Sequence, residues 1–377
     1  MRIALSYIRS APVGGVEKFL VTCASRLASH GHEVTVLCRE QAGPLPQNIR
    51  IRRLGGFALG SGAKVRAFAR AVERHLEQQR YDVVLGLGKT WSQDVLRLGG
   101  GLHRVFLEQT QEPGYRLRKL DVVSLAIEDR AFRAAGLQRI IANSEMVKRE
   151  VLQLFSLPAE RIAVIYNGVD SRRYDRQLHA DAAAVLRQKL GFGPREKVFL
   201  FLGNGFHRKG LKETLDAFAI VMAKAVSARL MVVGDDIEMA RYREQVRSLK
   251  LESRVVFLGA RNDAPICYAA ADVLVLPTRY DPFANATLEA LASGLPVITS
   301  DYNGGSEVIA ENINGTVVPR TGSAEELAHA MCEWANPERL EPARAAARVA
   351  ALRHPLEAKL DAVEALLTEI RVGRARA

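Results

Sequence analysis

Short apolar runs typical of buried β-strands alternate with amphipathic helical segments along almost the whole chain. The runs over 198–202 and 273–276 are apolar at every position, as expected for parallel strands that are covered on both faces. Helical periodicity follows many of these runs, for example over 15–29 and 62–79. This alternation predicts an α/β fold built from doubly wound parallel sheets with helices on both faces.

The same pattern places the expected elements along the chain. In the first half, strands are expected at 2–7, 33–38, 48–54, 82–86, 139–142 and 162–166. In the second half, they are expected at 197–203, 229–234, 254–258, 272–277 and 296–299. Helices are expected at about 15–29, 62–79, 117–135, 144–154, 209–226, 238–250, 284–293 and 323–335, with a last one at 356–370.

With 377 residues, the chain is long enough for two domains of ordinary size. A polar, weakly patterned stretch over 170–196 is the best candidate for the linker between them. We therefore expect an N-terminal Rossmann-like domain over 1–170 and a C-terminal one over 171–354. The last helical segment, about 355–377, is expected to pack back on the first domain.

The cysteines and the apolar runs exclude several classes of protein. Four cysteines lie far apart, with no CxxC pair and no histidine cluster at ligand spacing, which argues against a disulfide framework or a structural zinc site. The first apolar run is too short for a signal peptide. No stretch approaches the ~18–20 apolar residues that a spanning helix needs. We expect a cytoplasmic protein in a reducing compartment.

Ligands of open α/β sheets bind at the carboxyl ends of strands, so the loops that follow strands are the candidate sites. Gly14 and Gly15 lie in the first such loop, directly before a helix. Paired glycines there allow a phosphate or a sugar to approach backbone N–H groups at the positive end of the helix. An ordinary turn is the alternative interpretation.

The loop over 203–210 carries Arg208 and Lys209 next to the start of a predicted helix. Positive side chains are unfavourable at that end of a helix, so an anion such as a pyrophosphate would explain the pair. A solvated turn with two surface charges is the alternative. The loop is neither a Walker loop nor a GxGxxG fingerprint, so an NTPase or a dinucleotide-dependent dehydrogenase is not indicated.

The strongest pattern runs over 277–296, where Asp281 precedes a predicted helix and Glu289 follows eight residues later. A carboxylate can accept both hydroxyls of a ribose diol, which suits Glu289. The backbone amides at the helix start are placed to hold phosphate or sugar oxygens, and they belong to Ala284, Asn285 and Ala286. Either acid alone would be an ordinary cap or surface charge, but the whole arrangement is poorly explained in that way.

With these loops in this order, the chain resembles the retaining GT-B glycosyltransferases of family GT4. Asp281 and Glu289 resemble the E-x7-E signature of that family, and 288–297 resembles its L-E-A-x-A-x-G-x-P-V run. Further matching motifs are Gly14-Gly15-Val16-Glu17, Ala142-Asn143-Ser144, Asn167-Gly168-Val169-Asp170, Arg208-Lys209-Gly210 and Ala271-Asp272-Val273. The resemblance spans about 1–335 and implies two Rossmann-like domains that face each other across a cleft.

Within that family, the chain is most similar to the lipopolysaccharide-core glucosyltransferases that add glucose to heptose. The loop 206–211, the segment 280–285 and Gln93-Asp94-Val95 carry this closer similarity. It implies transfer of a hexose, glucose from UDP-glucose, with retention, to a lipopolysaccharide-core heptose or a similar glycolipid.

The resemblance also implies how the donor is held. Glu289 would bind the ribose, and Arg208 and Lys209 would bind the diphosphate and stabilise the charge that grows on the leaving phosphate. No metal and no other cofactor is expected. Asp235-Asp236 is the nearest match to a metal-binding DxD motif, and we interpret it as an ordinary loop.

Four more positions receive roles from the resemblance. Asp281 would contact hydroxyls of the donor sugar, Gly15 would approach the sugar or the leaving phosphate, and Arg173 would add a further contact. His103 stands at the place of a family histidine that contacts the donor sugar, although a surface histidine is the alternative. Two departures matter: Asp281 is one methylene shorter than the usual glutamate, and Gly100 stands where relatives carry an acidic residue.

The positive charge is concentrated in the first half of the chain. Residues 1–170 hold 25 Lys and Arg against 16 Asp and Glu, a net of +9, whereas the other 207 hold 28 against 26, a net of +2. One basic cluster lies within 50–80, and another within 97–119 is interleaved with apolar residues. Such patches suit an anionic membrane surface and an anionic glycolipid, so we expect the first domain to dock on the inner face of the cytoplasmic membrane.

Other functions remain as alternatives. The chain could be a GT4 transferase with another sugar donor or with an exopolysaccharide or glycolipid acceptor. A nucleotide-sugar 2-epimerase on the same fold is disfavoured by the order of the motifs. A nucleic-acid-binding protein is suggested only by the pI of about 9.7, because no RRM, KH or zinc signature accompanies the basic residues. The intact acid and basic pairs argue against a degenerate scaffold.

Overall fold

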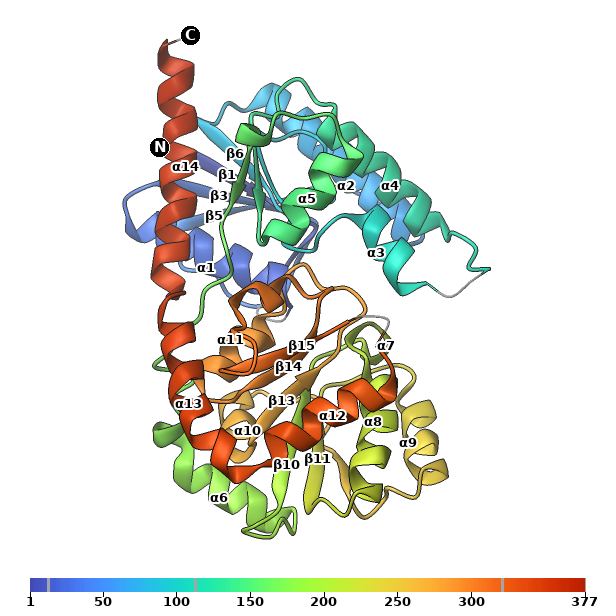
Figure 1. Ribbon diagram of the computed structural model, residues 1–377. Coiled ribbons are helices and arrows are strands. Elements are labelled where there is room, and N and C mark those ends of the chain that lie inside the picture. The colour runs from blue at the N-terminus through green and yellow to red at the C-terminus, as the bar shows by residue number, and fades with distance from the viewer. Residues whose placement is uncertain (12–13, 112–113, 320–321, 377) are drawn as a thin grey trace. The chain divides into compact units, whose positions relative to one another are not determined.

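The computed structural model describes residues 1–376 except 12–13, 112–113 and 320–321, and it divides into two compact units (Figure 1). Unit 1 comprises Met1–Tyr166 and Glu357–Ala377, and unit 2 comprises Asn167–Leu356. Each unit is built around one parallel sheet. The predicted fold class, two Rossmann-like halves with parallel sheets, is confirmed.

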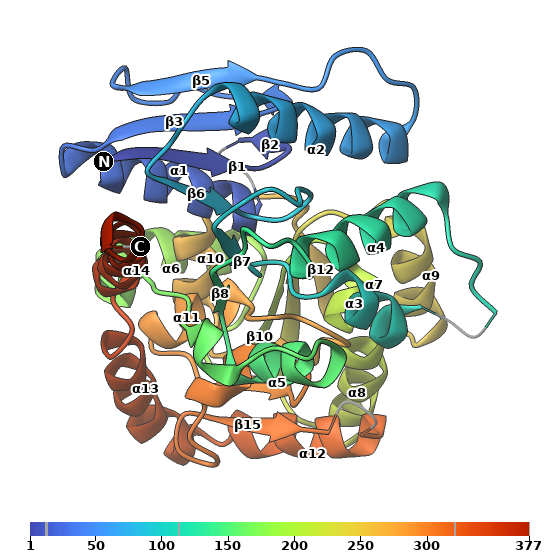
Figure 2. The ribbon, with the colours of Figure 1, turned by 90° about the horizontal axis from the view of Figure 1, so that it is seen from above.

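The sheet of unit 1 has seven strands in the order β5-β3-β1-β6-β7-β8-β9 (Figure 2). Strands added before β6 extend the sheet to one side of β1, and those from β6 onward extend it to the other side. The position between β1 and β6, which pair directly, is therefore the switch point of the sheet. A separate short pair is formed by β2 (Arg9–Ser10) and β4 (Glu40–Gln41). The strands are β1 (Arg2–Ser6), β3 (Glu33–Cys38), β5 (Ile49–Arg53), β6 (Val83–Gly86), β7 (Val95–Arg97), β8 (Arg139–Ala142) and β9 (Ile162–Val164).

Helices cover both faces of this sheet because right-handed crossovers to the two sides of the switch point lie on opposite faces. On one face, Phe68 and Val72 pack against Ala4, Leu37 and Val84 of three strands. The helices that connect these strands are α1 (Gly15–Ser29), α2 (Ser61–Gln78), α3 (His103–Thr110), α4 (Lys119–Phe132) and α5 (Glu145–Leu154), with a 3-10 turn η1 (Ala159–Arg161).

The C-terminal helix α14 (Leu356–Arg376) belongs to unit 1 from Glu357 onward and lies beside α1 (Figure 1). Its buried side chains include Val363 and Leu367. Arg26 of α1 forms an ion pair with Asp361 of α14 at 2.6 Å. In the turn after α1, the imidazoles of His30 and His32 are hydrogen-bonded to Glu364 at 2.7 and 2.9 Å. The helix therefore completes the core of a domain whose other residues come from the start of the chain.

The sheet of unit 2 has six strands in the order β12-β11-β10-β13-β14-β15. Its switch point lies between β10 and β13, where Phe199 pairs with Val273 and Leu200 with Leu274. The strands are β10 (Lys197–Leu202), β11 (Ala228–Val233), β12 (Val255–Phe257), β13 (Val273–Leu276), β14 (Val297–Ser300) and β15 (Gly315–Val318).

Two groups of helices pack in unit 2. In one group, α8 packs on α12 and α9, and in the other, α10 packs on α6 and α11, with α13 against α11. Their bounds are α6 (Ala180–Lys189), α7 (Phe206–Lys209), α8 (Leu211–Ala223), α9 (Met239–Ser248), α10 (Ala264–Ala270), α11 (Asn285–Ala292), α12 (Ala324–Ala335) and α13 (Pro337–Leu352). Short 3-10 turns are η2 (Arg176–His179) and η3 (Gly304–Val308).

The structure differs from the sequence prediction at one long segment. The stretch 170–196 was expected as a linker, but it folds into η2 and α6, and these pack on α10. Polar residues made this stretch resemble a linker, but Arg187 anchors α6 to the rest of unit 2. Its guanidinium donates to Asp272 at 3.3 Å and to the carbonyl of Glu196 at 2.6 Å. Strands β7 and β15, of three and four residues, were also missed, as was the short pair β2 and β4.

None of the helices in the described part of the chain is long and apolar enough to cross a membrane.

Candidate functional site

Two loops of unit 2 meet at the switch point of its sheet. The loop after β10 leads into α7 and α8, and the loop after β13 leads into α11. The Thr278 hydroxyl and the Arg279 backbone N–H both donate to the carbonyl of Arg208, at 2.9 and 2.8 Å. These bonds bring the two loops, which carry the strongest sequence motifs, into direct contact.

Gly210 is required where the two loops cross. Its φ is +80°, and a Cβ at this position would lie 2.1 Å from the carbonyl oxygen of Pro277. A side chain would therefore push the two loops apart. The glycine after the Arg-Lys pair thus permits close packing of the loops and leaves the cations beside the other loop.

Asp281 binds both cations of the first loop. Its Oδ2 accepts from Arg208 Nη1 at 2.5 Å and from Lys209 Nζ at 2.6 Å. Asp281 and Lys209 are each only 7% exposed. Burial alone would raise the pKa of the Asp281 carboxyl, but Lys209 and Arg208 outweigh it and lower this pKa to about 2.

Arg208 and Lys209 lie where the sequence placed them, directly before the start of a helix. They close the short α7, and the longer α8 begins at Leu211. Positive charge is unfavourable beside that helix start, so the pair calls for an anion. The anion that accompanies them in the structure is the carboxylate of Asp281. Both cations keep further N–H donors for a second anion, since an ammonium has three and a guanidinium five.

Glu289 lies on α11 and is held by tyrosines that the sequence interpretation missed. The Tyr268 hydroxyl donates to Glu289 Oε2 at 2.9 Å. Tyr174 packs edge-on against Tyr268, with ring centroids 5.7 Å apart. Burial, and then the charge of Glu289, raise the pKa of both phenols, so both stay protonated donors beside this carboxylate. Tyr174 lies in the segment mistaken for a linker, and Tyr268 lies on the short α10.

The backbone amides at the start of α11 are not all available. Ala284 donates its N–H to Asn303 Oδ1 at 3.0 Å. Asn285 and Ala286 occupy the first turn of α11, where N–H groups have no acceptor within the helix. The Asn285 side chain accepts a hydrogen bond from Asn167 at 2.8 Å, which links the Asn-Gly-Val-Asp motif to this helix start. Of the three amides expected to hold a ligand, that of Ala284 is thus already bonded to Asn303.

Arg173 lies on the same side of unit 2 as Glu289. Its side chain is exposed, and its guanidinium carbon is 5.8 Å from the centroid of the Tyr174 ring. Its backbone N–H donates to Asp170 Oδ1 at 3.1 Å, in a turn closed by the last residue of the Asn-Gly-Val-Asp motif. Unit 2 therefore brings Arg173, Glu289 and the tyrosine pair together.

The remaining two predicted site residues belong to unit 1. Gly15 is the exposed first residue of α1, and the preceding Gly14 caps that helix with φ +100°. His103 begins α3, and its Nε2 is 3.3 Å from Asp121 Oδ1. Burial and the charge of Lys89 lower the pKa of His103 against the opposing effect of Asp121.

Gly100 lies at the edge of a cavity in unit 1 that His103 also lines. A Cβ on Gly100 would meet nothing within 4 Å, so a side chain could begin at this position, where this chain lacks the acidic residue expected from relatives. In the Asp235-Asp236 loop, Asp236 accepts from the backbone N–H groups of Phe206 and Glu238, at 2.6 and 2.8 Å. No group of three or more potential metal-binding side chains exists among the described residues.

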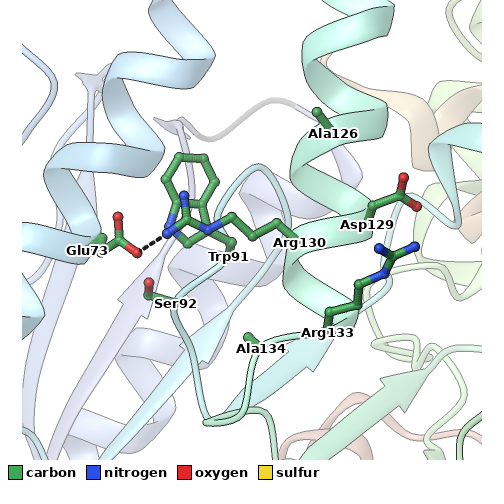
Figure 3. A pocket seen from close by; sticks show the side chains of 8 residues that line it. All are labelled: Glu73, Trp91, Ser92, Ala126, Asp129, Arg130, Arg133 and Ala134. Atoms are coloured by element: carbon green, nitrogen blue, oxygen red, sulfur yellow. Dashed lines mark hydrogen bonds and ion pairs between the residues drawn. The ribbon is translucent and has the colours of Figure 1, made fainter.

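A second hollow of unit 1, of about 610 Å³, contains none of the predicted site residues (Figure 3). Arg130 stacks over the Trp91 ring at 4.1 Å and pairs with Glu73 at 2.5 Å. Because the central cation already has an aromatic and an anionic neighbour, we interpret this hollow as a packing feature between α2 and α4.

Replacing Asp281 with asparagine should destabilise unit 2. The substitution leaves the buried Lys209 and Arg208 without their anion, and breaking a buried ion pair costs about 3–5 kcal/mol. Hydrogen exchange of the β10 and β13 amides in wild type and D281N should show this loss. Glu244→Gln is the control, because its exposed pair with Arg247 is worth less than about 1 kcal/mol. Equal protection in D281N and E244Q would contradict the role given to this carboxylate.

Comparisons with known proteins agree with this geometry. The family model described as Glycosyltransferase Family 4 matches residues 13–173, and the model described as Glycosyl transferases group 1 matches residues 183–350. Over 180 residues, the chain is 33% identical to the uncharacterized glycosyltransferase MJ1607 of Methanocaldococcus jannaschii. That match covers 47% of this chain and 46% of the relative, about half of each length.

Longer matches cover both units. The chain is 25% identical over 329 residues to the lipopolysaccharide glucosyltransferase WaaG of Escherichia coli K12, covering 87% of each chain. The crystal structure of WaaG superposes with a TM-score of 0.85 at 24% identity, over 97% of this chain and 99% of that one. Anabaena Alr3699/HepE in complex with UDP-glucose superposes with a TM-score of 0.77 at 23% identity, over 98% and 100%. The chain is therefore a glycosyltransferase of the GT4 type with the GT-B fold.

Proposed function

We propose that this glycosyltransferase moves glucose from UDP-glucose, with retention, to a heptose of a lipopolysaccharide core or to a similar anionic glycolipid. The observation that carries the proposal is the cluster of Asp281, Arg208 and Lys209 beside Glu289 at the switch point of unit 2. The donor is taken from the UDP-glucose complex of HepE, and lipopolysaccharide from the name of WaaG, which matches 87% of the chain. The heptose and the retention are carried over from the family resemblance.

The charges in unit 2 suit the diphosphate of the donor. When the bond between the sugar and UDP breaks, negative charge grows on the β-phosphate, and fixed cations stabilise it best where water is excluded. Lys209 is buried and Arg208 half-buried, and Asp281 holds both side chains in place. Their remaining N–H donors, together with the amides of Asn285 and Ala286, would bind the phosphate oxygens.

Glu289 would bind the ribose of the nucleotide. Its carboxylate already accepts one hydrogen bond from Tyr268, which fixes its orientation and leaves its other lone pairs for two hydroxyls. Asp281 would contact the donor sugar through Oδ1, whose partner in the structure is the Phe283 backbone N–H at 3.2 Å. The proposal also includes the contacts expected from the family resemblance. His103 would contact the donor sugar, Gly15 would approach the sugar or the leaving phosphate, and Arg173 would add a further contact.

Replacing Glu289 with glutamine should reduce transfer strongly while the fold is kept. An amide offers one acceptor in place of a carboxylate, and each hydrogen bond to a charged group is worth about 1.5–3 kcal/mol, or about 10- to 150-fold in kcat/KM. Transfer from UDP-glucose measures the effect, with Glu325→Gln on the exposed first turn of α12 as the matched control. Activity of E289Q equal to that of E325Q would refute the assignment of the ribose site.

Metal ions are not needed in this proposal, because Arg208 and Lys209 supply the positive charge. We therefore expect that EDTA leaves the rate of transfer unchanged. The measurement is the transfer rate in metal-free buffer before and after EDTA, and then after Mg²⁺ or Mn²⁺ is returned. A loss of activity that either ion restores would show that a metal takes part.

The proposal includes docking of unit 1 on the inner face of the cytoplasmic membrane. The loop between β5 and α2 exposes Phe57 and Leu59, 91% and 77% exposed. Basic side chains flank this loop, and those of α2 recur at four-residue spacing on its exposed side: Arg66, Arg70 and Arg74. Apolar side chains among cations are the pattern of proteins that bind anionic lipid surfaces.

The second basic cluster expected from the sequence lies only partly on the surface. Arg97 is buried against the Phe19 ring, 3.9 Å from its centroid. Arg104 pairs with Asp129 at 3.3 Å, and Arg118 pairs with Asp121 at 3.5 Å, while Arg116 and Lys119 are exposed. Arg97 therefore does not belong to a surface patch, and the rest of the cluster stays a prediction. The proposed membrane contact is the loop over 57–59 with α2.

The double substitution Phe57→Ser and Leu59→Ser should weaken membrane binding by about tenfold or more, since burying one large apolar side chain contributes about 1.5–3 kcal/mol. Flotation with vesicles of phosphatidylcholine and phosphatidylglycerol measures binding. The matched control is Leu178→Ser, a position 65% exposed in unit 2. Binding that ignores phosphatidylglycerol content, or a double variant that floats like the control, would disprove this contact.

A further inference from the structure

Unit 1 contains a cavity of about 260 Å³ that the donor groups of unit 2 do not explain. It lies at the carboxyl ends of β1, β6 and β7, the end of a parallel sheet where ligands bind. One wall is apolar and includes Leu98, Phe106 and Ile127, while the other carries polar groups from the loop after β6 and from α4. Its volume is below the ~300 Å³ of typical small-molecule pockets, so it suits one sugar-sized group rather than a whole glycolipid.

Lys89 is the most unusual residue of this cavity. Its backbone has φ +63°, a left-handed conformation that residues other than glycine rarely adopt. Strain of this kind costs about 1–3 kcal/mol and persists mainly at functional sites. Here it places a half-buried ammonium in the wall of the cavity, where burial lowers the pKa of Lys89 against the opposing charges of Glu128 and Asp121.

The two neighbouring acids do not form an ion pair with Lys89. Glu128 accepts from the backbone N–H groups of His103 and Arg104 at 2.5 and 3.2 Å. Asp121 Oδ2 accepts from the Tyr115 hydroxyl at 2.6 Å and from the Arg118 backbone N–H at 2.9 Å. Each carboxylate therefore accepts hydrogen bonds from the backbone N–H groups of the helix start or loop beside it.

The ammonium of Lys89 consequently has hydrogen-bonding capacity left. Within the described part of the chain, its hydrogen-bond acceptor is Ser124 Oγ at 3.1 Å, and no carboxylate lies within 4 Å of it. An ammonium has three N–H donors, so two remain for a ligand. His103 also lines the cavity, and burial and then the charge of Lys89 lower the pKa of its imidazole.

We propose that this cavity binds a sugar group of the acceptor that carries a phosphate or a carboxylate, and that Lys89 recognises that anion. That the ligand is the acceptor rests on the proposed function. The anion-binding site itself is inferred from residues of unit 1 alone. Phe106 and the neighbouring apolar wall contact the sugar ring, and Ser124 holds the ammonium toward the cavity. Lys89 thus determines which acceptors are used, and it takes no part in donor binding.

Direct binding tests the anion site without any need for transfer. Ligand-observed NMR is recorded with mannose 6-phosphate, glucuronate, neutral mannose and inorganic phosphate on the full chain. We expect binding of mannose 6-phosphate, glucuronate or both, weaker binding of inorganic phosphate, and none of mannose. Equal binding of inorganic phosphate and the sugar anions would overturn the sugar assignment, and binding of mannose alone or of no probe would overturn the anion site.

Variants at position 89 test the residue. Lys89→Gln removes the charge and Lys89→Arg keeps it, and both retain a Cβ at the strained position. We expect Lys89→Gln to bind the sugar anion about 10- to 100-fold more weakly, and Lys89→Arg and the control Lys64→Gln to bind it nearly as wild type does. Binding that is unchanged in K89Q would overturn the proposal.

Two further measurements keep the result interpretable. If K89Q does not fold, acetylation of Lys89 in the wild-type chain is followed by mass spectrometry, and the sugar anions must slow it where mannose does not. UDP-glucose hydrolysis is measured in parallel and should be unchanged in K89Q. If the wild-type chain does not hydrolyse UDP-glucose, the proposed function is contradicted. If it hydrolyses UDP-glucose but does not bind the sugar anions, only this inference is contradicted.

Discussion

The carboxylate of Asp281 is the interaction on which the arrangement of unit 2 depends. It joins two loops that are about 70 residues apart in the chain, by accepting from Arg208 and Lys209 within 2.6 Å. Without it, two adjacent cations in a largely buried position would repel each other at a large desolvation cost. With it, they are held beside the start of α11 with donors left over. The shorter acid of this chain thus reaches both cations.

The buried or half-buried lysines of the two units, Lys209 and Lys89, have different anionic neighbours. In unit 2, the single carboxylate of Asp281 pairs with both Arg208 and Lys209, so one of the two positive charges remains for a ligand. In unit 1, the carboxylates near Lys89 are bonded to backbone N–H groups, so the ammonium is near negative charge but not paired with it. The first arrangement fixes side chains for a diphosphate, whereas the second leaves a cation to be satisfied by an anionic ligand.

Most of the secondary structure could be predicted because parallel strands and amphipathic helices leave a local periodic pattern. The helix at 15–29 and the strand at 139–142 were placed to the residue. Failures fall where stability comes from distant partners: Arg187 holds α6 through Asp272, and α10 is only seven residues long. The tyrosines that hold Glu289 lay in these two regions, so they were missed. Arg97 was placed on the surface because its packing against Phe19 has no local signal.

By itself, the sequence determined the fold class, the doubly wound pattern and the loops that carry the motifs, because each depends on residues close together in the chain. Which charges lie in contact was decided only by the tertiary structure, since sheet order brings β10 beside β13, and Arg26 of α1 meets Asp361 of α14 only in the folded chain. That is why the ion pairs of Asp281 with Arg208 and Lys209 were not predicted from the sequence, whereas its contact with the donor sugar stays a proposal. It is also why Lys89, which belongs to no recognised motif, became the residue of interest in unit 1: burial and missing partners are properties of the folded chain.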